Sequence, residues 1–121
     1  MKLRDTWQKV KKANEKILGE KFFGHMDLGR LLDSAEKAEA DYKKVPGSAD
    51  EAKLKKARKK VYDAYAATER PVAVYLKNIS MARKANAGDK ATLGALDDVY
   101  NVLSMKIAAV TDEKLKLYKS R

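Results

Sequence analysis

Apolar residues recur along the chain in alternating steps of three and four, the spacing of one face of a helix. The clearest row in residues 28–45 consists of Leu28, Leu31, Ala35, Ala38, Tyr42 and Val45. Because a turn of α-helix holds about 3.6 residues, these side chains form one apolar stripe, which leaves water only by packing against a partner. The pattern therefore predicts helices that pack on one another.

Three further rows have the same spacing. They are Leu3, Trp7, Val10, Asn14 and Ile17; Leu54, Ala57, Val61, Ala64 and Thr68; and Leu96, Tyr100, Leu103, Ile107 and Val110. No stretch alternates between apolar and polar residues for long enough to predict a strand. We expect an all-α protein, an antiparallel up-and-down bundle of about four helices. The residues expected in its core include Leu31, Tyr42, Val61, Leu103 and Ile107.

The first helix is predicted over residues 6–18, with Asp5 and Gln8 as a capping box and Gly19 at its end. The polar Asn14 in its apolar row either specifies register or lies at a partly exposed edge, and the edge is the simpler interpretation. The loop that follows carries apolar side chains that we expect to cover the open end of the bundle, namely Phe22, Phe23 and Met26.

Asp27 is the predicted N-cap of the second helix, which should end at the Pro-Gly pair of residues 46–47. Ser48 and Glu51 have the spacing of a capping box for the third helix. Residues 87–89, Ala-Gly-Asp, should end that third segment and cap the last helix. These short connections make consecutive helices antiparallel neighbours.

Pro71 interrupts the pattern of the third helix. Proline lacks a backbone N–H and collides with the carbonyl group four residues earlier, so the helix must kink or stop near Arg70. The apolar row resumes at once with Val72, Tyr75 and Ile79. We therefore expect a long third helix that is kinked or broken near Pro71, and we favour the kinked continuation.

Composition indicates one soluble domain. A chain of 121 residues is long enough for one hydrophobic core, so residues 1–121 are expected to form a single helical-bundle domain. No window approaches the roughly 20 consecutive apolar residues of a membrane span, and the charged N-terminal residues do not resemble a signal peptide. The lack of cysteine excludes thiolate chemistry and fits a reducing compartment. We expect a cytoplasmic location.

The sequence lacks the motifs of enzyme and cofactor sites. His25 is the only histidine, and it stands in a glycine-flanked loop without an orienting partner at a useful spacing. No Glu precedes it by three residues, as a di-iron bundle would require. Asp97 and Asp98 are adjacent, so they point to different sides of a helix rather than forming one paired site. We expect no catalytic residue, no cofactor and no metal.

The strongest functional signal is a cationic run. Lysine and arginine outnumber aspartate and glutamate by 27 to 17, a formal charge of +10, which favours association with polyanions or anionic surfaces. At about 100° per residue, Leu54, Ala57 and Val61 share a narrow arc of the third helix, and cations cover the opposite side. The candidate polyanion-binding residues on that side are Lys53, Lys55, Lys56, Arg58, Lys59, Lys60 and Tyr62.

These observations favour a non-catalytic interaction or structural module that acts through its basic surface, with a protein partner or self-association. The alternative is a protein that binds nucleic acid without sequence preference through residues 53–60, where Tyr62 would be an exposed ring able to stack on a base. The same lysines would also suit an anionic membrane or an acidic protein. The simplest interpretation of the run is a solvated face whose lysines only keep the helix soluble.

Overall fold

The computed structural model describes residues 2–23 and 27–119, and helices hold 86 % of them. These residues contain no strand, which confirms the all-α prediction. In chain order the elements are α1 (Leu3–Leu18), α2 (Glu20–Phe23), α3 (Leu28–Lys44), α4 (Glu51–Ala66), α5 (Glu69–Ala85), α6 (Lys90–Asn101), the π-helical segment η1 (Val102–Ala108) and α7 (Ala109–Tyr118). None of these helices is long and apolar enough to cross a membrane.

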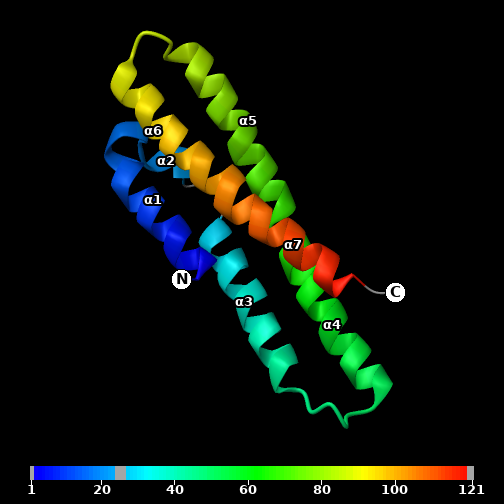
Figure 1. Ribbon diagram of the computed structural model, residues 1–121. Helices are drawn as coiled ribbons and strands as arrows, with labels where there is room; N and C mark the ends of the chain where they lie inside the picture. Colours follow the sequence, from blue (N-terminus) through cyan, green and yellow to red (C-terminus); the bar gives the residue numbers. More distant parts are fainter. Residues whose placement is uncertain (1, 24–26, 120–121) are drawn as a thin grey trace.

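Two long rods form the frame of the molecule (Figure 1). One consists of α4 and α5, which follow nearly the same line, and the other of α6, η1 and α7 without a break. The rods lie side by side in opposite directions, because α5 packs on α6 and α4 packs on α7. The shorter helices cover them: α1 packs on α6 and η1, and α3 packs on α4. The protein is thus an elongated antiparallel bundle.

The buried side chains form two clusters along this frame. The first core joins α1, α2, α3, α5, α6 and η1, and consists of Trp7, Val10, Phe23, Leu28, Leu32, Val72, Tyr75, Ile79, Leu96, Val99, Leu103 and Ile107. The second core joins α3, α4 and α7, and consists of Ala35, Ala38, Val61, Tyr65 and Tyr118. The first core is rich in large aliphatic and aromatic groups. The second is smaller and contains two tyrosines whose hydroxyl groups need partners.

The predicted core is confirmed at Val61, Leu103 and Ile107, which are fully buried. The prediction was wrong at Leu31, which is only half-buried, while its neighbour Leu32 has no exposed surface. Tyr42 is half-buried as well and packs against the second core.

A partial rotation of the buried stripe on α3 explains this difference. The buried stripe keeps Leu28, Ala35 and Ala38 of the predicted row but turns toward Leu32 and Glu39. Its buried residues are Leu28, Gly29, Leu32, Ala35, Ala38 and Glu39. The apolar pattern alone favours Leu31 and Tyr42, because the alternative stripe requires a glutamate to face inward. Glu39 is buried because two tyrosine hydroxyl groups donate hydrogen bonds to it.

Two predicted helix ends are confirmed. Gly19 ends α1 with a φ of 87°, in the left-handed region where a residue without a Cβ is favoured. Asp27 caps α3, since its Oδ1 accepts a hydrogen bond from the backbone N–H of Arg30 at 3.1 Å. Phe23 is buried against Trp7, with ring centroids 5.8 Å apart, as expected of a cover at one end of the bundle. The loop predicted for this segment was wrong at Glu20–Phe23, which form the short helix α2. His25 and Met26 lie outside the described residues.

Two predicted capping boxes are wrong. The helix α1 begins at Leu3 rather than after Asp5, and Glu36 of α3 accepts a hydrogen bond from the backbone N–H of Arg4 at 3.3 Å. A carboxylate from another helix thus satisfies one of the first backbone donors of α1, which has no side-chain cap of its own. The helix α4 begins after Asp50, whose Oδ1 accepts from the backbone N–H of Lys53 at 2.7 Å. Asp50 lies directly before the first turn, so Ser48 is not the cap.

The long third helix is interrupted just before Pro71, as predicted. Ala67 and Thr68 separate α4 from α5, and both keep right-handed helical dihedral angles. Ala67 is the residue whose carbonyl group a normal residue 71 would have bonded, so the interruption follows from the missing N–H of proline. Helical bonding resumes with Val72, whose N–H donates to the Thr68 carbonyl oxygen at 3.2 Å. The rod continues in nearly the same direction (Figure 1).

Asn14 is buried, with 6 % of its surface exposed, so the partly exposed edge position predicted for it is wrong. Its Nδ2 donates to the Val10 carbonyl oxygen at 2.9 Å and to Asp98 Oδ2 at 2.7 Å. A buried amide is tolerated in this apolar row because α6 supplies a charged acceptor.

The pair Leu31 and Leu32 tests the rotation of α3. Leu32→Ala should lower the free energy of unfolding by about 2–5 kcal/mol, because it removes a fully buried side chain. Leu31→Ala, its matched control one residue away, should cost clearly less. Urea unfolding measures both. Equal losses, or a larger loss at Leu31, would contradict the observed stripe.

Candidate polyanion-binding surface

The cations predicted on the outer side of α4 lie there, with one exception. Val61 points into the second core, and Leu54 and Ala57 are half-buried on the same side of the helix. The exposed residues opposite are Lys53, Lys55, Lys56, Lys59 and Lys60, which we call the lysine row. The row begins in the first turn of the helix, at the end of the rod remote from α5.

The charges of the lysine row are not compensated by ion pairs. No described carboxylate lies within 4.0 Å of any of its ammonium groups. Cations elsewhere in the described chain do form such pairs: Arg4 lies 3.0 Å from Asp33, and Lys114 lies 2.9 Å from Glu39. The lysine row therefore offers five unpaired ammonium groups to an external anion.

Arg58 is the exception. Its guanidinium group donates to the carbonyl oxygens of Leu117 and Lys119 at the end of α7, and lies 5.9 Å from the centre of the Tyr118 ring. The last carbonyl groups of a helix lack partners within the helix and carry partial negative charge, so an arginine there completes the helix end. The sequence assigned Arg58 to the free cationic face, and the structure instead gives it a contact between α4 and α7.

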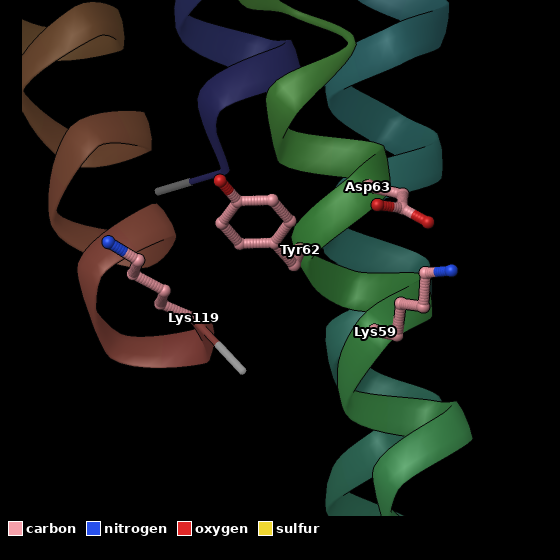
Figure 2. A pocket seen from close by; sticks show the side chains of 4 residues that line it. All are labelled: Lys59, Tyr62, Asp63 and Lys119. Atoms are coloured by element: carbon pink, nitrogen blue, oxygen red, sulfur yellow. The ribbon is translucent and has the colours of Figure 1, made fainter. Parts of the chain in front are cut away.

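Tyr62 also differs from expectation. It was predicted to be an exposed ring among cations, but it is half-buried and packs partly against the second core. Its remaining surface lines an open pocket of about 450 Å³. The pocket is bounded by Lys59, Asp63 and Lys119, so it joins the side of the lysine row to the end of α7 (Figure 2).

Beneath this surface a buried carboxylate connects three helices. Glu39 of α3 accepts hydrogen bonds from the hydroxyl groups of Tyr65 in α4, at 3.1 Å, and Tyr118 in α7, at 2.7 Å. The ammonium group of Lys114 lies 2.9 Å from the same carboxylate. Sequence reasoning missed this network, because the acid and both phenols come from segments far apart in the chain.

The network shifts the pKa values of its members. Burial alone would raise the pKa of Glu39, but the hydrogen bonds from Tyr118 and Lys114 and the nearby ammonium charge together hold it below its ordinary value. Burial and the neighbouring carboxylate raise the pKa of Tyr118 to about 12. Both shifts favour the charge state in which an ionised Glu39 accepts from a neutral phenol.

The adjacent carboxylates of Asp97 and Asp98 do not form a paired site. Asp97 pairs with Arg83, and Asp98 accepts from Asn14, so the two adjacent carboxylates have separate partners as the helix geometry predicts. No group of three or more histidine, cysteine, aspartate or glutamate side chains in residues 2–23 and 27–119 has a geometry that could hold a metal ion. No protein-family model, curated protein or solved structure matches the chain.

The contact made by Arg58 predicts a structural role. Arg58→Gln should lower the free energy of unfolding by about 1–2 kcal/mol, since it removes charged hydrogen bonds to the end of α7. Lys60→Gln, which removes a neighbouring exposed cation, is the matched control and should leave stability nearly unchanged. Urea unfolding distinguishes the two. Equal stability of both variants would contradict the helix-end contact.

The lowered pKa of Glu39 predicts a loss of stability in acid. Because the pKa of Glu39 is lower in the folded protein than its ordinary value of 4.5, its ionised form stabilises the fold above that pH. This contribution disappears as the pH falls through the folded-state value. As the pH falls below 4.5, the wild type should therefore lose more stability than Glu39→Gln, whose amide has no charge to lose. Urea unfolding at each pH measures the stability of both proteins. Equal losses of stability in the wild type and in Glu39→Gln would contradict the network.

Proposed function

We propose that the protein is a non-catalytic interaction module that binds polyanions, above all the phosphate backbone of nucleic acid, through the lysine row of α4. The observation that carries this proposal is a set of five exposed lysines on one helix without ion-pair partners among the described residues. A face of one sign attracts anions, and its effect falls as salt increases.

The length of the row fits a series of phosphates. From Lys53 to Lys60 the helix rises about 10 Å. Over that distance duplex DNA carries about six phosphate charges when both strands are counted. Several lysines can therefore contact phosphates at once. Each contact is weak, but together they give a higher affinity.

The chemistry of the row favours binding without sequence preference. An ammonium group on a flexible stem is a point charge that suits phosphate, whereas the planar fork of arginine suits the paired acceptors on a guanine edge. The arginine within this segment, Arg58, already donates to carbonyl oxygens of α7. The row is thus equipped for backbone contacts and not for reading base edges in a groove.

Tyr62 favours nucleic acid over other polyanions. An acidic protein or an anionic membrane would attract the same lysines, but neither needs an aromatic ring beside them. The Tyr62 ring lines a pocket together with Lys59 of the row. Aromatic rings beside cations are typical of surfaces that bind single-stranded nucleic acid, where bases stack on the rings.

Salt dependence tests the proposal. With about four or five phosphate contacts, a plot of log affinity for duplex DNA against log salt concentration should have a slope near −4. The variant Lys55→Gln, Lys56→Gln, Lys59→Gln should flatten that slope by about two to three units and leave unfolding unchanged, because these side chains are exposed. Fluorescence anisotropy with labelled duplexes of two unrelated sequences measures both effects and the expected lack of preference.

A matched control separates the lysine row from net charge. Lys77, Lys84 and Lys106 are equally exposed but lie on α5 and η1. Changing these three to glutamine alters the net charge by the same amount, and it should change the slope by clearly less. No binding near 50 mM salt, or equal effects of the two triple variants, would assign the row a solubilising role only.

A further inference from the structure

We propose that the pocket between α4 and the end of α7 binds one unpaired guanine nucleotide of a single-stranded nucleic acid, with the base on Tyr62 and the phosphates on Lys59 and Lys119. This inference rests on the proposed function and names a ligand for a part of that surface. The pocket volume of about 450 Å³ falls in the range of roughly 300–1,000 Å³ common for small-molecule sites.

The Tyr62 ring forms the floor of the site. It is half-buried against the second core, so its position is fixed by packing while part of the ring stays open to the pocket. Figure 2 views the ring nearly face-on, in the space between α4 and the end of α7. A fixed aromatic face with one open side suits stacking of a single base, and a base pair within a duplex has no free face to offer.

Two lysine side chains from different helices line the pocket together with Tyr62. Lys59 extends from α4, one turn before Asp63, and Lys119 extends from the end of α7 on the other side of the ring (Figure 2). The position of Lys119 is held by a contact with α4. Its carbonyl oxygen accepts a hydrogen bond from Arg58 at 3.4 Å, which ties the main chain at this residue to α4. Phosphates on either side of a stacked base would each meet a cation.

Asp63 gives the site its choice of base. Its carboxylate is exposed at the rim of the pocket and has no ion-pair or hydrogen-bond partner for its side chain among the described residues. A carboxylate repels phosphate but accepts N–H donors. Guanine offers two adjacent donors, its N1–H and its N2 amino group, which match the two carboxylate oxygens. Thymine and uracil offer one donor, and adenine offers its amino group alone.

The test compares short thymidine oligomers of one length that carry guanine, hypoxanthine or thymine at the central position. Hypoxanthine is guanine without the N2 amino group, so it isolates one of the two hydrogen bonds. We expect the guanine oligomer to bind at least about fivefold more tightly than the thymine oligomer, with hypoxanthine between them. The same series in RNA should show the same order of affinities, since no sugar contact is part of the proposed site.

Two variants identify the residues responsible. Asp63→Asn keeps the size of the side chain but replaces one acceptor by a donor, so the preference for guanine over hypoxanthine should fall below about twofold. Tyr62→Leu removes the ring but keeps an apolar group against the second core, and Tyr62→Phe retains the ring as its matched control. Single-strand affinity should fall severalfold with leucine and persist with phenylalanine, while duplex binding stays unchanged in both Tyr62 variants.

The outcomes separate this inference from the proposed function. Equal affinity for the three oligomers, or a guanine preference that survives in Asp63→Asn, would overturn the guanine site even if salt-dependent duplex binding is found. Absence of single-strand binding would overturn it as well. If the wild type prefers guanine in single strands but does not bind duplex DNA, the role of the lysine row is overturned and the pocket site stands.

Discussion

The part of the bundle around the second core, where α3, α4 and α7 meet, depends on one buried carboxylate. Glu39 lies among apolar side chains of α3, where an isolated charge would cost several kcal/mol. It is tolerated because Tyr65, Tyr118 and Lys114 each direct a polar hydrogen to it, from two other helices. The small apolar residues of the second core bring the helices close, and the carboxylate fixes how they meet. Both features hold α7 beside α4.

That contact also determines the outer surface. With α7 held against α4, Arg58 reaches the last carbonyl groups of α7 and leaves the set of free cations. The five remaining lysines form no ion pair with a described carboxylate, so their charges stay available to an external anion. The same contact brings Lys119 to the edge of the Tyr62 pocket. Stability and the proposed binding surface thus share one helix interface.

The first half of the bundle is built in a more ordinary way. Large side chains such as Trp7, Leu32 and Leu96 fill it, and polar groups inside it are few and paired. The buried amide of Asn14 is one of them, bonded to Asp98 across α1 and α6. Apolar packing in this half and a polar network in the other give the two long rods different partners along their length.

The sequence by itself determined the long helices and several of their ends, because periodicity, glycine and proline act through the local backbone. It also located Pro71 as the interruption and the lysines of α4 as an exposed row. It could not determine the rotation of α3, the start of α1, the burial of Asn14 or the contact of Arg58. Each of these depends on a partner from a distant segment: Tyr118 for Glu39, Glu36 for Arg4, Asp98 for Asn14 and the end of α7 for Arg58. Only the tertiary structure brings such groups together, and a polar group is stable inside the protein only where its partner is present.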